Sequence, residues 1–123
     1  DDCPRYKSSQ SPSGGCYLTS ACVEAIGLSD DCYELATLRL FRDGYMRSTS
    51  TGPVDICEYY LTAPLIVNKI KESPNAKTVF EKIYHELVRP CVELIERKKN
   101  EDAYELYRNY TRMLQKQYIA DLL

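Results

Sequence analysis

Apolar residues recur every three or four positions along most of this chain, which is the spacing of one face of an α-helix. Between residues 29 and 45 this spacing is carried by Leu35, Leu38, Phe41 and Tyr45. Ser29, at the start of the run, is a favourable N-cap, and Gly27 before it is suited to end a preceding helix over 16–26. No segment shows the convincing period-two alternation that a half-buried strand requires. The pattern therefore predicts an all-α fold.

Prolines interrupt two of the predicted helices. Pro53 suits the first turn of a helix whose apolar face comprises Ile56, Tyr60, Val67 and Ile70. Pro64 lies inside this helix, and its missing N–H should bend the helix or divide it. Pro90 interrupts the next helix in the same way, within the stripe of Val79, Ile83, Leu87, Cys91 and Leu94. We therefore expect proline-kinked helices.

The two ends of the chain have different patterns. The last helix, from about Asn100, carries one line of mostly apolar residues at Tyr104, Tyr107, Thr111, Leu114 and Tyr118, and a second at Ala103, Leu106, Tyr110 and Met113. It should pair with the preceding helix as an antiparallel hairpin. Residues 1–15 are polar and rich in turn formers, which indicates a loosely held tail or linker. The predicted architecture is one small bundle of four to six helices over residues 16–123.

Charge and length exclude several classes of function. The chain has 123 residues, with 16 basic and 18 acidic side chains and a net charge of −2. Nucleic-acid modules usually carry a basic excess, so no nucleic-acid partner is expected. No stretch approaches the roughly 20 apolar residues of a membrane span. No cofactor motif is apparent, and the compartment is left open.

Six cysteines allow several interpretations, because an even number can form bridges and reduced thiols can pack as small apolar groups. Cys22 and Cys32 flank the predicted turn at 27–29, so they are the candidate disulfide pair. Cys16 lies where the first helix begins, and a helix N-terminus stabilises a thiolate. Cys16 is therefore the candidate catalytic residue. The scattered cysteine spacing predicts no metal site.

Two groups of residues are candidates for binding. Eleven tyrosines and no tryptophan are present, and Tyr59 and Tyr60 are placed either to line a groove or dimer face or simply to pack in the core. Arg39 and Asp43 stand one helical turn apart and can pair. Arg42 can instead grip a carboxylate or phosphate with two hydrogen bonds.

Three segments together resemble the CFI-box C-terminal domain family of bacterial proteins, whose function is not established. They are Gly14-Gly15-Cys16-Tyr17-Leu18-Thr19-Ser20-Ala21, Leu38-Arg39-Leu40-Phe41-Arg42-Asp43 and Tyr59-Tyr60-Leu61-Thr62-Ala63-Pro64. The resemblance covers roughly residues 14–92. Cys22 departs from the family, which usually has a small residue there. The resemblance implies a bacterial-type helical domain and draws attention to Cys16, Arg39, Arg42 and Asp43, but it implies no substrate or reaction.

These observations leave three functional hypotheses. The first is a non-enzymatic interaction or accessory module that binds a protein or peptide, or a second copy of itself. It rests on the tyrosine-rich faces and the lack of a complete catalytic set. The second is a thiol-dependent enzyme or redox protein that uses Cys16. The third is a secreted binding protein stabilised by disulfides.

Overall fold

The computed structural model describes residues 17–29 and 31–120, and within these ranges the chain forms helices and no strand. The all-α prediction is therefore confirmed. The helices are α2 (Tyr17–Ala25), α3 (Tyr33–Phe41) continued by η1 (Arg42–Met46), α4 (Gly52–Lys71), α5 (Ala76–Ile83) continued by η2 (Tyr84–Val88) and α6 (Arg89–Glu96), and α7 (Asn100–Ile119). The predicted tail at 1–15 and Cys16 lie outside the described residues.

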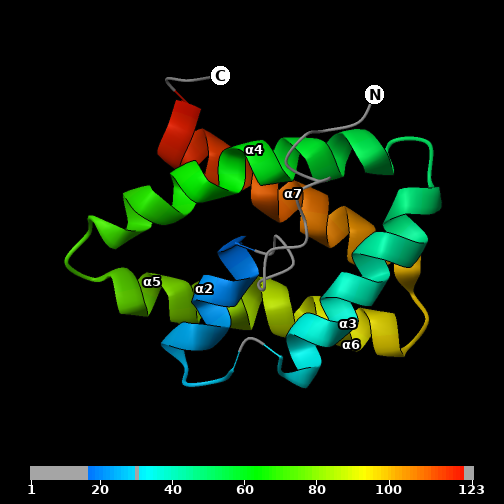
Figure 1. The fold of residues 1–123 in the computed structure, drawn as a ribbon, viewed down its shortest axis with the longest axis horizontal. Helices are drawn as coiled ribbons and strands as arrows, with labels where there is room; N and C mark the ends of the chain where they lie inside the picture. The colour runs from blue at the N-terminus through cyan, green and yellow to red at the C-terminus, as the bar shows by residue number, and fades with distance from the viewer. Residues whose placement is uncertain (1–16, 30, 121–123) are drawn as a thin grey trace.

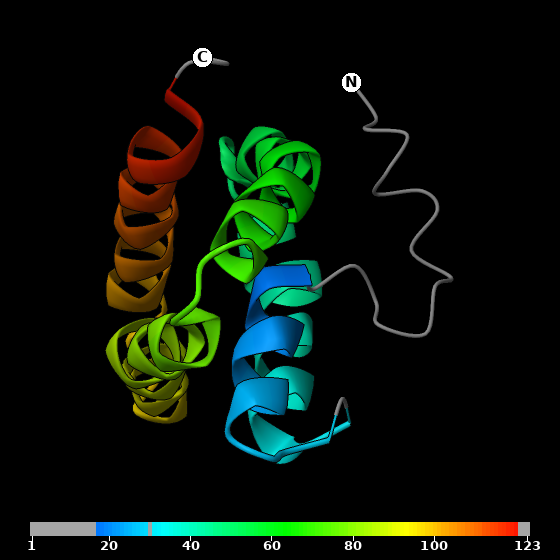
Figure 2. The same ribbon diagram turned by 90° about the vertical axis from the view of Figure 1, so that its left-hand side faces the viewer.

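Two long helices, α4 and α7, lie side by side, and the continuous rod of α5, η2 and α6 passes beneath them (Figure 1). Figure 2 shows α2 and α3 on one side of the molecule, and α7 together with this rod on the other. The predicted hairpin of the last two helices is confirmed, since α6 packs against α7. The chain reverses between them at Lys98, which has a left-handed φ of 61°.

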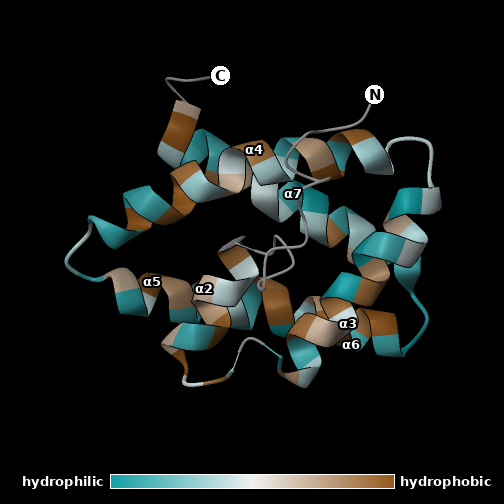
Figure 3. Cartoon of the chain, viewed as in Figure 1, coloured by the Kyte–Doolittle hydropathy of each residue, from teal (hydrophilic) through white to brown (hydrophobic). Residues whose placement is uncertain are grey.

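The helices enclose a common apolar core. Both brown and teal segments appear along the helices in Figure 3, as expected of amphipathic helices that bury one face. Buried leucine and isoleucine side chains reach this core from α3, α4, η2 and α7. They are Leu35, Ile66, Leu87 and Leu114. This core fixes the helices that carry the candidate site residues.

A π-helical turn changes the predicted face of the helix that contains Phe41. Met46 is buried at 1% exposure, whereas Tyr45, which the three-and-four spacing placed in the core, is only half-buried. The spacing from Phe41 to Met46 is five residues, which matches the i to i+5 turn of η1. The prediction failed here because it assumed a regular α-helix.

The two internal prolines have different outcomes. Helix α4 stays a single helix through Pro64, so the predicted division does not occur. Pro90 lies in the first turn of α6, directly after the π-helical η2. The wider π turn relieves the clash between a proline ring and the preceding turn.

The turn between α2 and α3 confirms one prediction and corrects another. Gly27 has a φ of 87°, and the N–H of Leu28 donates to the carbonyl of Val23 at 2.9 Å, so Gly27 ends α2 as predicted. Ser29 is not the N-cap of the next helix. That position belongs to Cys32, and the Ser29 hydroxyl donates instead to Asp31.

Candidate functional site

Arg42 already holds a carboxylate with two hydrogen bonds, and the carboxylate belongs to its neighbour Asp43. The Arg42 Nε lies 2.8 Å from Asp43 Oδ1, and Nη2 lies 3.1 Å from Oδ2. The remaining Nη1 donates to the hydroxyl of Tyr60. Arg39 is half-buried on α3, almost one turn earlier. The predicted two-point grip of Arg42 is therefore made within the chain itself.

Tyr59 and Tyr60 belong to the core, which is the alternative that the sequence left open. They are 5% and 1% exposed. The Tyr59 hydroxyl accepts a hydrogen bond of 3.2 Å from the backbone N–H of Leu18, and so connects α4 to the start of α2. Arg42 connects η1 to α4 through Tyr60. These tyrosines join helices, and a role for them in binding a partner stays a prediction.

The described part of the first resemblance segment, residues 17–21, therefore meets the other two segments around the start of α2. A closed cavity between them is lined by Thr19, Leu38, Phe41, Arg42, Met46, Tyr59 and Tyr107. Its volume is about 20 Å³, which suits about one water molecule. This cavity has no room for a ligand larger than water.

The predicted bridge between Cys22 and Cys32 is absent, since both residues are free thiols. Cys22 is fully buried in the core on α2. Cys32, at the start of α3, directs its thiol to the carboxylate of Glu34. Burial raises the pKa of Glu34, but the hydrogen bonds from its own backbone, Tyr84 and Cys32 and the charge of Arg89 outweigh burial, so the pKa is lowered. The two cysteines do not pair because the Cys22 thiol packs in the core, whereas the Cys32 thiol contacts Glu34.

The thiols should differ in reactivity. Burial raises the pKa of Cys22 and of Cys91 to about 12, so at pH 8 both thiols are almost entirely protonated and unreactive. Cys32 is half-buried and more accessible. Timed alkylation with site-resolved mass spectrometry should label Cys32 at least tenfold faster than either buried thiol. Equal rates at the three sites would contradict the described packing, and the rate at Cys16 in the same experiment tests the thiol-enzyme hypothesis.

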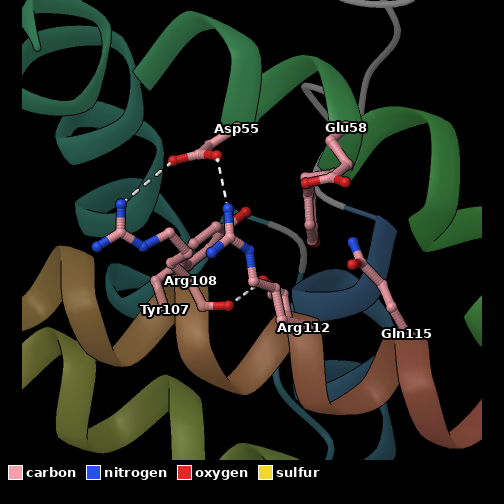
Figure 4. Close-up of a pocket in the computed structure, with 8 residues that line it drawn as sticks. Asp55, Glu58, Tyr107, Arg108, Arg112 and Gln115 are labelled. Atoms are coloured by element: carbon pink, nitrogen blue, oxygen red, sulfur yellow. Dashed lines mark hydrogen bonds and ion pairs between the residues drawn. The ribbon is translucent and has the colours of Figure 1, made fainter. Parts of the chain in front are cut away.

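A polar seam joins α4 to α7, and we define it as Asp55, Tyr104, Arg108 and Arg112. Asp55 Oδ2 lies 3.8 Å from Arg108 Nη1, and Oδ1 lies 3.6 Å from Arg112 Nη2 (Figure 4). The Tyr104 hydroxyl donates to Asp55 and shares a 2.9 Å hydrogen bond with Thr51. Burial, and then the bond to Asp55, raise the pKa of Tyr104.

The polar seam has little free space. The pocket drawn in Figure 4, which also includes Glu58 and Gln115, has a volume of about 10 Å³. Gln115 Nε2 donates to Thr62 Oγ1 at 3.1 Å and extends the polar contact along both helices. The arrangement ties the helices together and leaves no room for a ligand larger than water. The only sequence signal for it was the spacing of Arg108 and Arg112 by one turn of α7.

A wider hollow opens between α6 and α7, and we call it the α6–α7 groove. It is lined by Leu94, Asp102, Glu105, Leu106, Asn109, Tyr110 and Met113, with a volume of about 590 Å³. The described residues that line the groove include four apolar or aromatic side chains, two carboxylates and no basic group. It is the size of a site for a few side chains of a partner.

Tyr110 makes one side of the α6–α7 groove more acidic. Its hydroxyl donates to Glu86 Oε1 at 2.7 Å, so a third carboxylate lies close to the groove. Burial, and then the bond to Glu86, raise the pKa of Tyr110 well above its usual range. Met113, one turn further along α7, is 45% exposed. The second apolar line of the last helix contains Leu106, Tyr110 and Met113, but the sequence did not show that it would remain partly uncovered.

Other site classes find no support in the described part of the chain. Residues 17–29 and 31–120 hold no group of three or more histidine, cysteine or acidic side chains arranged to bind a metal ion. Among the helices described there, none combines the length and the apolar character needed to cross a membrane. His85, the single histidine, is exposed and makes an edge contact with the ring of Tyr84.

No protein-family model, curated protein or solved structure matches this chain. The resemblance to the CFI-box family therefore stays a prediction, and the function has to be argued from the geometry alone.

Proposed function

We propose that this protein is a non-enzymatic interaction module whose α6–α7 groove binds a protein segment bearing both apolar and basic side chains. The observation that carries the proposal is the composition of the groove, whose lining combines apolar side chains with two carboxylates. Leu94, Leu106 and Met113 offer apolar area that a partner can remove from water.

The charges favour a basic partner. Asp102 and Glu105 line the α6–α7 groove, and Glu86 lies beside it through its bond to Tyr110. Complementary charge at the edge of an interface speeds association and fixes orientation. An amphipathic helix with leucine on one face and lysine on its flanks combines both requirements, in the helix-in-groove mode of recognition.

The other two hypotheses have less support. The hypothesis of a disulfide-stabilised binding protein loses the one disulfide it named, because Cys22 and Cys32 are free thiols. Thiol chemistry at Cys16 stays a prediction, because that residue lies outside the described ranges. The polar cluster of Arg42, Asp43 and Tyr60 is satisfied internally and has only a water-sized cavity beside it.

The test uses two synthetic helical peptides that differ only in charge, one with leucine and lysine and one with leucine and glutamate. Fluorescence anisotropy at low salt should show binding of the lysine peptide and at least tenfold weaker binding of the glutamate peptide. The double variant Asp102→Lys with Glu105→Lys should reverse this preference. Met113→Asp should weaken binding of the lysine peptide about tenfold, because it replaces an apolar lining residue with a charged one.

The matched control changes the same net charge elsewhere. Glu24 and Glu72 are exposed, on α2 and just after α4, and neither lines the groove. The double variant Glu24→Lys with Glu72→Lys should keep the wild-type preference within about twofold. Equal loss in both double variants would show attraction by net charge alone and would contradict the proposal, as would equal affinity for the two peptides.

A further inference from the structure

Helix α4 carries a row of exposed apolar residues on its outer face, and we call Val54, Leu61 and Leu65 the α4 stripe. They are 70%, 52% and 41% exposed. Their spacings of seven and four residues place them on one side of the helix. Ile56, Ala63 and Ile70 on the opposite side are buried in the core. Figure 1 shows α4 along one edge of the molecule. The exposure of the α4 stripe, against the burial of the opposite side, shows that the stripe faces away from the core.

Two opposite charges lie on the same flank of the α4 stripe. At 100° per residue, Glu58 and Lys69 project about 40° and 60° from Val54 in the same direction. Both are exposed. Within the described ranges, neither forms an ion pair.

The charges of one copy of α4 match those of a second copy only when the two helices are antiparallel. When two identical helices pack antiparallel, each flank faces the same flank of the other copy. Glu58 of one copy then meets Lys69 of the second, and the reverse pair forms across the twofold axis. In a parallel pair each flank faces the opposite flank, and these charges would not meet.

We infer that a second copy of this chain docks antiparallel on the α4 stripe. The twofold axis passes near residues 63 and 64, so Leu61 of each copy packs against Leu65 of the other. The surface is separate from the α6–α7 groove, so this inference does not depend on the proposed function. Because each copy offers only three apolar side chains, the dimer is a reversible one that forms as the concentration rises.

Zero-length cross-linking with a carbodiimide tests the register directly, because it joins only a carboxylate and an amine in contact. Glu58 and Lys69 are about 16 Å apart along one helix, too far for a link within one chain. The expected result is a product of twice the chain mass, with a Glu58–Lys69 cross-link identified by mass spectrometry. A cross-linked dimer that lacks the Glu58–Lys69 link would overturn the antiparallel register.

Sedimentation of the full chain tests the energetics. Leu61→Glu with Leu65→Glu should abolish the dimer, whereas Leu40→Glu, at a 76% exposed site on α3, should leave it unchanged. Glu58→Lys or Lys69→Glu alone should raise the dissociation constant about tenfold, because each creates two repulsive contacts. The double exchange should restore affinity to within about threefold, and a failure to restore it would overturn the pairing.

Other occupants of the stripe give distinct results. A monomer in which Glu58 cross-links to Lys7 of the same chain would assign the stripe to the N-terminal segment and overturn the inference. A monomer at every concentration with no cross-link from Glu58 would also overturn it, and would leave the stripe to a different protein.

Discussion

Replacing Gly52 with alanine should destabilise the protein by about 3 kcal/mol or more. Gly52 is the first residue of α4 and is buried. A Cβ at this position would lie 1.6 Å from the carbonyl oxygen of Met46, 2.5 Å from its carbonyl carbon and 2.6 Å from Thr49 Oγ1. These distances are far below van der Waals contact, so the backbone would have to move.

The atoms in the way of that Cβ are fixed by the turn between η1 and α4. The Met46 carbonyl accepts hydrogen bonds from the Thr49 N–H at 3.1 Å and from Thr49 Oγ1 at 2.8 Å. The Gly52 N–H donates in turn to Thr49 Oγ1 at 2.9 Å. Relieving the clash therefore breaks the turn and shifts α4 relative to η1. The cost combines lost hydrogen bonds with disturbed core packing around Met46.

Urea denaturation followed by circular dichroism measures this effect, and Gly44 provides the matched control. A Cβ on Gly44 meets no atom within 4 Å, and the residue lies in the helical segment η1. Gly44→Ala should be neutral or stabilise by up to about 1 kcal/mol, because alanine restricts the unfolded chain. Similar free energies of unfolding for both variants would show that the close approach at Gly52 is not present in solution.

Replacing Asp55 with alanine should cost about 2 kcal/mol, the second largest effect expected of a single substitution here. The Asp55 side chain is 11% exposed and receives Tyr104, Arg108 and Arg112 from α7. Removing it leaves the guanidinium groups of Arg108 and Arg112 without the carboxylate that pairs with both. The Tyr104 hydroxyl loses its hydrogen bond to Asp55 and keeps the one with Thr51. Since the arginines are partly exposed at 33% and 53%, water recovers part of the loss.

Glu93 serves as the control for Asp55, because it also pairs with an arginine but at the surface. It is 53% exposed and lies 3.6 Å from Arg89, which is 49% exposed. Glu93→Ala should change the free energy of unfolding by less than about 0.5 kcal/mol. If urea denaturation gave equal values for Asp55→Ala and Glu93→Ala, the polar seam would contribute no more than an ordinary surface pair.

Local sequence signals determined the helices. The spacing of Leu35, Leu38 and Phe41, the turn at Gly27 and the start near Pro53 each depend on neighbours within a few residues. Such signals act through backbone geometry and side-chain spacing, so they can be read before the tertiary fold is known. The all-α fold and the final hairpin follow from them.

The tertiary structure decided how the helices face one another, because that depends on contacts between distant residues. Tyr59 and Tyr60 are buried by α2 and η1, and the Arg42 grip turned out to be internal. Asp55 meets Arg108 more than fifty residues later in the chain. The failed pairing of Cys22 with Cys32 has the same origin, since core burial of one thiol and the Glu34 contact of the other are set by packing.

The surfaces proposed for binding show the same division. The sequence determined which residues of the last helix are apolar, and it placed Leu106, Tyr110 and Met113 on one line. Only the packing of α6 against α7 decided that this line stays partly open beside Asp102 and Glu105. Periodicity shows that a helix has an apolar face, whereas the neighbouring helices determine how much of that face they cover.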